Sequence, residues 1–284
     1  MGAFWRCRDR EVPLGERTLV MGIVNVTPDS FSDGGMFDDA DAAVKHGVRL
    51  LEEGADVLDV GGESTRPGSD PVDADEERRR VLPVVEGLRR EAPEALLSVD
   101  TRKAAVAADA LDAGADVVND IGAGADPVMF DVVARAGAGI VLMHMKGEPK
   151  TMQVDPTYDD VVGEVRSFLA ERIAAAVSAG VAPDGLCVDP GIGFGKTLAH
   201  NLELLRAIDT FRDLGAPVLA GVSRKRFVGE LSAALDPADR LEGTLGAVAW
   251  CASRGVDLVR VHDVAPVVRL LRVVDAIARG RPDG

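Results

Sequence analysis

The chain has 284 residues, of which 46% are apolar, and a formal net charge of −15. A chain of this length can form one large domain, and α/β barrels often reach this size as a single domain. The acidic balance argues against general nucleic-acid binding, which needs a basic surface.

The sequence gives no indication of export or membrane insertion. Residues 1–10, MGAFWRCRDR, are charged where a secretory signal is apolar, and Arg6 stands where an acylation signal has Ser or Thr. No apolar run approaches the length of a membrane span. Cys7, Cys187 and Cys251 are scattered, without the spacing of a disulfide framework or a thiolate zinc site. We therefore expect a reduced, cytoplasmic protein that does not bind membranes.

Short β-branched runs alternate with amphipathic helical stretches along the chain. The predicted strands are 18–26, 56–61, 96–100, 116–121, 139–145, 186–189, 217–222 and 257–262, and helical patterns include 40–53, 76–91, 158–179 and 201–214. Three helix-to-strand joints, EEGADVLDV, DAGADVVND and SRGVDLVRV, share a Gly that suits the left-handed residue closing a helix. Eight strand–helix units predict a TIM (β/α)8 barrel as a single domain over residues 1–284, with a doubly wound open sheet as the alternative.

Polar residues cluster at the end of every predicted strand. They are Asn25, the 63–66 loop, Asp100, Asn119, Met143 with His144, Asp189, the 223–226 segment, and Arg260 with His262. A single Asp or Asn at a strand end is more often a helix cap than a ligand. In a barrel, however, the carboxyl ends of the strands converge on one mouth. The whole set therefore predicts one site, whereas an open sheet would spread it along a crevice.

Two carboxylates and an amide suit a flat heterocycle edged with amino, ring N–H and carbonyl groups. Asp100, Asn119 and Asp189 would project into the mouth from three strands. Buried carboxylates are costly without partners, and a ligand with several donors would supply them. The alternative is two helix caps and a structural Asn.

The segment DPGIGFGK at 189–196 resembles a phosphate loop only superficially. Pro190 stands where the Walker pattern needs Gly, so nucleoside triphosphate binding is not indicated. The glycines suit close approach of the backbone to a ligand. Phe194 is then either an aromatic wall of the site or part of the core.

Basic residues recur where an anion could dock. They are Arg66, the 224–226 run, and Arg260 with His262. Arginine forks suit bidentate phosphate contacts, and Arg260 points the same way as His262 along one strand. No H-E-x-x-H pattern or Cys/His cluster indicates a catalytic zinc. Mg²⁺ held by Asn25, water and a diphosphate fits the few protein ligands that this ion usually takes.

With these segments in view, the chain resembles the dihydropteroate synthases of the folate pathway. The matching motifs are NVTPDSFSDGG (25–35), DVGGESTRPG (59–68), SVDTRK (98–103), VVNDI (117–121), LMHMKGEPKTMQ (142–153), DPGIGFGK (189–196), GVSRKRF (221–227) and VRVHD (259–263). They span nearly the whole chain in the family's order. The resemblance implies a homodimeric TIM barrel that joins 6-hydroxymethyl-7,8-dihydropterin diphosphate to p-aminobenzoate and releases diphosphate.

The resemblance also implies roles by motif position. The pterin would be held by Asp100, Asn119, Asp189 and Lys225, in a slot lined by Met143 and Phe194. The diphosphate would be held by Thr65, Arg66, Arg260 and His262, and Mg²⁺ by Asn25. The p-aminobenzoate site would be completed by Phe31, Asp33 and Pro67, and by Arg226, which replaces the Ser of some family members. Its carboxylate would then meet either the Arg226 guanidinium or a helix-terminal N–H.

These groups imply electrostatic catalysis rather than acid–base catalysis. Mg²⁺ and the basic side chains would stabilise charge on the departing diphosphate, and Asp33 would favour the pterin cation that a neutral arylamine then attacks. The candidate catalytic residues are Asp33, Lys225, Arg260 and His262.

A pterin-dependent methyltransferase would not need Arg66, the Arg260–His262 pair and the Asn25 loop together. A silent pterin-binding paralogue would show damage in the first two loops, and both are intact.

Overall fold

A computed structural model describes residues 3–26, 36–64 and 69–280 of the chain. Its centre is a sheet of eight parallel strands in the order β8-β7-β6-β5-β4-β3-β10-β9. These are β3 (Leu19–Asn25), β4 (Val57–Gly61), β5 (Leu96–Asp100), β6 (Val117–Asp120), β7 (Gly139–Met143), β8 (Leu186–Asp189), β9 (Leu219–Ala220) and β10 (Leu258–Val261). A parallel bridge between Val188 and Val218 joins the two ends of this order. The sheet therefore closes, which confirms the TIM barrel and excludes the open sheet.

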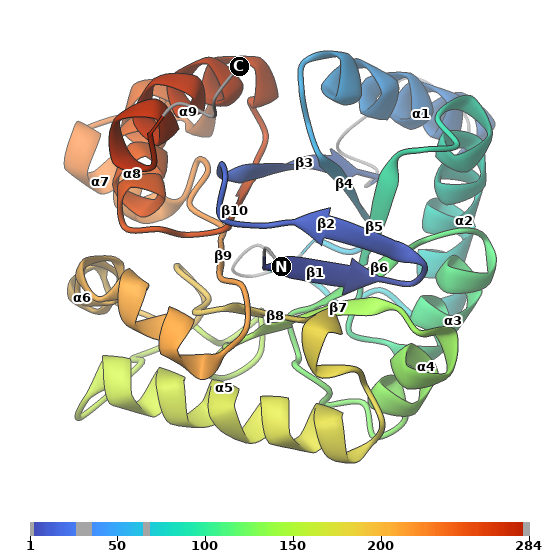
Figure 1. Cartoon of the computed structure of the whole chain (residues 1–284), viewed down its shortest axis with the longest axis horizontal. Helices are drawn as coiled ribbons and strands as arrows, with labels where there is room; N and C mark the ends of the chain where they lie inside the picture. The colour runs from blue at the N-terminus through green and yellow to red at the C-terminus, as the bar shows by residue number, and fades with distance from the viewer. Residues whose placement is uncertain (1–2, 27–35, 65–68, 281–284) are drawn as a thin grey trace.

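Helices surround the barrel (Figure 1). They are α1 (Met36–Glu52), α2 (Ala74–Glu91), α3 (Ala104–Asp112), α4 (Met129–Ala136), α5 (Val161–Ser178), α6 (Leu198–Arg206), α7 (Arg226–Ser232), α8 (Leu241–Ser253) and α9 (Val264–Ala278). Short 3₁₀ helices lie at Pro183–Gly185, Ile208–Leu214 and Pro237–Asp239. The single helix predicted for 201–214 is wrong, because α6 ends at Arg206 and a 3₁₀ segment follows. None of the described helices is long and apolar enough to cross a membrane.

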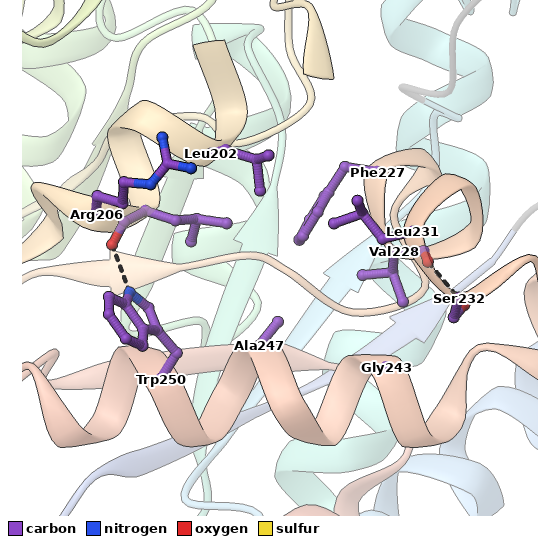
Figure 2. A pocket seen from close by; sticks show the side chains of 10 residues that line it. Leu202, Arg206, Phe227, Val228, Leu231, Ser232, Gly243, Ala247 and Trp250 are labelled. Atoms are coloured by element: carbon purple, nitrogen blue, oxygen red, sulfur yellow. Dashed lines mark hydrogen bonds between the residues drawn. The ribbon is translucent and has the colours of Figure 1, made fainter. Parts of the chain in front are cut away.

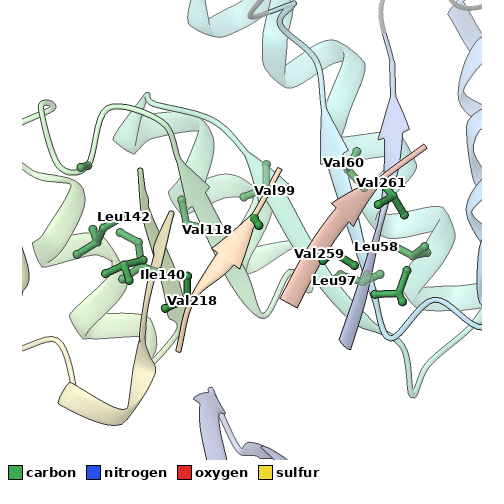
Figure 3. Packing of buried hydrophobic residues seen from close by; sticks show 14 of the residues in the cluster. Leu58, Val60, Leu97, Val99, Val118, Ile140, Leu142, Val218, Val259 and Val261 are labelled. Atoms are coloured by element: carbon green, nitrogen blue, oxygen red, sulfur yellow. The ribbon is translucent and has the colours of Figure 1, made fainter. Parts of the chain in front are cut away.

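Each barrel strand is buried on both faces, which explains why the strands appear in the sequence as continuous apolar runs. Outward-facing residues such as Val60, Leu97, Val118 and Leu142 pack beneath the helices in one large cluster (Figure 3). Inward-facing residues alternate with them along each strand, because successive side chains point to opposite faces. This alternation decides which polar residues face the inside of the barrel.

The amino-terminal end of the barrel is closed by a β-hairpin that the sequence analysis did not anticipate. Strand β1 (Phe4–Cys7) pairs antiparallel with β2 (Arg10–Pro13), and the hairpin lies across the barrel in Figure 1. Trp5 and Cys7 are fully buried against the first inward-facing residues of the barrel strands, among them Leu19 and Val57. The Trp5 indole donates to the Gly185 carbonyl oxygen at 3.0 Å. Among the described residues, the hairpin thus fills this end of the barrel, and we expect the site at the opposite end.

The glycines at the three helix-to-strand joints have the left-handed conformation that the sequence predicts. Gly54, Gly114 and Gly255 have φ of +103°, +113° and +81°. Each follows a helix and precedes a strand of the barrel. Because a side chain is strained in this conformation, Gly is the residue that can turn the chain there without cost.

Candidate active site

Three polar residues and one glycine lie side by side at the carboxyl ends of four adjacent strands. Asn25 pairs in register with Gly61, Gly61 with Asp100, and Asp100 with Asn119. Asn25 lies on the same face of β3 as the inward-facing Met21, so it faces the inside of the barrel. A Cβ added to Gly61 would lie 3.4 Å from the Asp100 Cβ, so the missing side chain leaves room beside that carboxylate. The expected convergence of Asn25, Asp100 and Asn119 on one mouth is confirmed.

Met143 and Asp189 extend this mouth on the next two strands, where they are partners in register. Both are buried. Asp189 Oδ1 accepts the Gly191 N–H at 2.7 Å, and burial nevertheless raises the pKa of Asp189. Its second oxygen, Oδ2, lies beside Gly221. A Cβ on Gly221 would lie 3.7 Å from this oxygen, so the glycine leaves space next to it. This carboxylate is suited to accept a hydrogen bond from a ligand.

Arg260 reaches from β10 across the interior to two carboxylates. Its Nε donates to Asp59 Oδ2 at 2.6 Å and its Nη2 donates to Asp100 Oδ2 at 2.7 Å. Asn119 Nδ2 donates to the same Asp59 oxygen at 2.9 Å. Asp59 therefore belongs to the site, although sequence reasoning missed it. The available signal was a charged residue inside the apolar run of β4, since such residues are rarely buried without a partner.

The surroundings of this cluster move the pKa of Asp100 toward neutral pH. Burial raises the pKa of Asp100 to about 7, against the opposing effect of Arg260 and with a further increase from Asp59. A carboxyl group with such a pKa is only partly ionised at neutral pH in the free protein. A ligand that donates hydrogen bonds to it favours the ionised form.

Lys225 lies at the mouth, immediately before α7, and its ammonium group sits over the face of Phe194. The Lys225 Nζ is 3.9 Å from the centre of the Phe194 ring, which is a cation–π contact. Burial lowers the pKa of Lys225 to about 8, and Asp189 opposes this shift. A Cβ on Gly193 would lie 3.2 Å from the Lys225 Cδ, so the glycine makes room for the lysine stem. The expected proximity of Lys225, Phe194 and Asp189 is confirmed.

The glycine-rich segment after β8 packs backbone against backbone on the end of β7. Gly191 has φ of +69°, and a Cβ there would lie 1.9 Å from the His144 carbonyl oxygen. The buried Lys196 donates to the carbonyl oxygens of Phe194 at 2.9 Å and His144 at 3.3 Å. Close approach is thus what these glycines provide, as expected, but the backbone they approach is the protein's own.

His144 does not face the mouth, which corrects the expectation that Met143 and His144 both do. Strand alternation turns Met143 inward and His144 outward, toward Phe168 of α5 at 5.0 Å between ring centres. Its Nδ1 lies 3.0 Å from Lys196 Nζ. Burial and the Lys196 charge lower the pKa of His144 to about 3, so the ring is neutral.

The basic run at 224–226 divides among three environments. Only Lys225 turns into the mouth. Arg224 forms a two-pronged ion pair with Asp263, with N–O distances of 2.6 and 2.9 Å. Arg226 begins α7, pairs with Glu230 at 2.6 Å and leaves 80% of its side chain exposed.

His262 Nδ1 lies 3.0 Å from Ser223 Oγ at the rim.

Five expected site residues lie outside the described residues: Phe31, Asp33, Thr65, Arg66 and Pro67. In the described part of the chain, no group of three or more His, Cys, Asp or Glu side chains could hold a metal ion. Asn25 offers a single amide oxygen at the end of β3, which is compatible with Mg²⁺ only if a substrate and water supply most of its ligands.

Known proteins resemble this chain over nearly its whole length. The family described as "Pterin binding enzyme" matches residues 21–262. The dihydropteroate synthase of Escherichia coli K12 is 46% identical over 257 residues, 90% of each chain. That of Synechocystis is 44% identical over 266 residues, covering 93% of this chain and 92% of its own.

The solved structures agree in fold as well as sequence. Xanthomonas albilineans dihydropteroate synthase with 4-aminobenzoic acid is 49% identical and superposes with a TM-score of 0.91 over 98% of both chains. The same enzyme in complex with 7,8-dihydropteroate is 47% identical, with a TM-score of 0.87 over 96% of this chain and 98% of its own. From its sequence and its barrel alike, the chain belongs to the dihydropteroate synthases, pterin-binding transferases of the pterinylmethyl group.

Proposed function

We propose that this chain carries out the family's reaction at the barrel mouth. It joins 6-hydroxymethyl-7,8-dihydropterin diphosphate to p-aminobenzoate, forms 7,8-dihydropteroate and releases diphosphate, as a step of folate biosynthesis. The observation that carries the proposal is the gathering of Asp100, Asn119, Asp189 and Lys225 at one mouth. In support, the Xanthomonas albilineans relative was solved with 4-aminobenzoic acid and with 7,8-dihydropteroate.

The pterin binds between the buried carboxyl groups at the mouth. Asp100 and Asp189 accept from its amino and ring N–H donors, Asn119 adds an amide, and Lys225 donates to a ring carbonyl or nitrogen. Phe194 packs against the lysine stem and, with Met143, confines the flat ring. Donors on the ligand satisfy carboxylates that burial otherwise disfavours, which explains why such groups can lie in this interior.

The diphosphate lies above the pterin, toward the rim. Arg260 uses two of its five N–H groups on Asp59 and Asp100, which leaves three for an anion. His262 at the rim, together with Thr65 and Arg66, completes the anion contacts. These fixed donors stabilise negative charge on the leaving diphosphate as the bond to the exocyclic carbon breaks.

The arylamine nitrogen of p-aminobenzoate, held by Phe31, Pro67 and Arg226, attacks that carbon and then loses a proton. Asp33 favours the positive charge that develops on the pterin.

Mg²⁺ would be held by Asn25 and the diphosphate oxygens. Asn25 faces the inside of the barrel next to the side-chain-free Gly61, so its amide oxygen is open to a ligand-bound cation. When bound, the ion neutralises charge on the diphosphate and thereby makes it a better leaving group.

We also propose that two copies of this chain pair through α7 and α8. An apolar groove of about 430 Å³ lies between α6, α7 and α8, on the outside of the barrel rather than at its mouth. Figure 2 shows Trp250 at one end of the groove and Phe227, Val228 and Leu231 at the other. Leu231 is 59% exposed and Trp250 is 41% exposed, so this face presents large apolar side chains to solvent. Sedimentation should give a dimer that Leu231→Glu converts to monomer, whereas Val154→Glu, a change at another exposed apolar residue, leaves it intact.

The three cysteines support a reducing compartment. Cys7, Cys187 and Cys251 are all buried and unpaired. We therefore propose that the protein works in the cytoplasm.

The test of the reaction is diphosphate release. Purified protein is mixed with the pterin diphosphate, p-aminobenzoate and Mg²⁺, and diphosphate is measured against time, with p-aminobenzoate omitted as the control. Release that requires both substrates supports the proposal. Folded protein that binds pterin without releasing diphosphate would make it a silent pterin-binding protein instead.

A further inference from the structure

Asp59 occupies the centre of the polar network beneath the mouth. Its side chain is 0% exposed. One oxygen, Oδ2, accepts from Arg260 Nε and from Asn119 Nδ2. In the barrel, β4 stands two strands from β10 and two strands from β6. A single oxygen thus ties together two site residues from opposite sides of its own strand.

The contact with Asp59 fixes which atoms Asn119 offers to a ligand. The Asn119 Nδ2 donates to Asp59 Oδ2 at 2.9 Å, the oxygen that also accepts from Arg260 Nε, so the Asn119 NH₂ group faces Asp59. Reversing the amide would place its carbonyl oxygen against the carboxylate, which is repulsive. Asn119 therefore turns its oxygen and one remaining N–H toward the mouth. An acceptor beside a donor matches a ligand edge in which an amino group adjoins a ring nitrogen.

The same carboxylate fixes Arg260. The guanidinium is planar, and its Nε and Nη2 are bound to two different carboxylates, Asp59 and Asp100. This leaves the plane of the fork no freedom to rotate. The remaining N–H groups consequently point in set directions before any ligand arrives.

Asp59 is a costly residue for the barrel itself. Its second oxygen, Oδ1, has no hydrogen-bond partner among the described residues, and neither has Ser98 Oγ. Asp59 and Ser98 are partners in register on β4 and β5, so both unsatisfied atoms lie in one layer below the mouth. Burying a charge with an unpaired oxygen opposes folding. Both hydrogen bonds that Asp59 does accept come from residues of the site.

We propose that Asp59 is a positioning residue that determines the ligand specificity of this mouth, by orienting the Asn119 amide and the Arg260 fork so that a 2-amino heterocycle is preferred over its 2-oxo counterpart. This inference rests on the proposed function, because it names what lets the same site select a pterin. Asp59 itself touches neither substrate.

The experiment compares two probes by calorimetry: 6-hydroxymethylpterin, which carries the 2-amino group, and 6-hydroxymethyllumazine, which carries oxygen in its place. Wild-type protein should prefer the pterin. Asp59→Asn frees the Asn119 amide to reverse, so pterin affinity should fall about tenfold or more while lumazine affinity changes much less. The ratio of the two dissociation constants is the readout, because a general loss of stability would not change it.

Asp116 provides a matched control. It is also a buried aspartate paired with an arginine, Arg89 at 2.7 Å, but it lies before β6 at the closed end of the barrel. Asp116→Asn should lower the unfolding temperature and leave the pterin-to-lumazine ratio at its wild-type value. Asp59→Ser, which is shorter and uncharged, repeats the test if Asp59→Asn does not fold.

The outcomes separate the two proposals. Wild-type protein that binds neither probe overturns the proposed function and this inference together. Wild-type protein that prefers pterin, with the same ratio in Asp59→Asn, overturns only the role of Asp59. Failure of both Asp59 variants to fold also overturns it, since Asp59 would then be required by the barrel. A ratio that collapses in the Asp59 variants alone supports the inference.

Discussion

Replacing Asp100 by Asn should change how the stability of the barrel depends on pH. Burial raises the pKa of Asp100 from its ordinary 3.8 to about 7 in the folded chain. Between these values the folded chain holds a proton that the unfolded chain has released, so the contribution of Asp100 to stability is full below about pH 4 and is lost as the pH rises through about 7. Three pKa units at about 1.4 kcal/mol each amount to roughly 4 kcal/mol.

The assay is urea unfolding of wild type and Asp100→Asn at a series of pH values from 4 to 8. The unfolding free energy of wild type minus that of the variant should decrease by up to about 4 kcal/mol across this range. A difference that stays constant would refute the reasoning, because Asp100 would then have the same pKa folded and unfolded. A difference that grows with pH would show that the Arg260 ion pair outweighs burial.

Further changes test other parts of the structure. Lys225→Ala should reduce turnover at least about tenfold with little change in unfolding temperature, whereas Lys150→Ala, at an exposed lysine, should leave turnover unchanged. Gly191→Ala should destabilise the chain by more than about 2 kcal/mol, since its Cβ would meet a carbonyl oxygen, while Gly137→Ala, with similar φ and open space, should cost only about 1 kcal/mol. Trp5→Ala should cost about 3–5 kcal/mol in urea unfolding, because it empties the closed end of the barrel. Chelation of Mg²⁺ should abolish diphosphate release without abolishing binding of 6-hydroxymethylpterin, which carries no diphosphate.

The barrel and its mouth were predictable because two local signals coincide. Apolar runs mark the strands, and a polar residue at the end of each run marks the carboxyl edge. Asp100, Asn119 and Asp189 follow from that rule alone. The prediction for His144 was wrong because the rule ignores the alternation of side chains along a strand. Met143 faces inward, so the next residue must face outward.

What sequence could not predict depends on closure of the barrel. Asp59 lies inside an apolar run, and its importance arises only when Arg260, 201 positions later, comes within hydrogen-bond distance. Similarly, nothing local distinguishes Lys225, which enters the mouth, from Arg226, which pairs with Glu230 in its own helix turn. The β1–β2 hairpin was missed because its strands have only four residues each. Such short segments are too short for an alternation of apolar and polar residues to be recognised.

The hairpin at the closed end also bears on how the chain is made. Trp5 is synthesised well before its hydrogen-bond partner, Gly185, which lies 180 positions later in the chain. Its apolar surroundings include Leu258, the first residue of the last strand. The hairpin can therefore complete its packing only after Leu258 has been synthesised. At this end of the barrel, a segment that is translated before all eight barrel strands completes its docking only after the last of them.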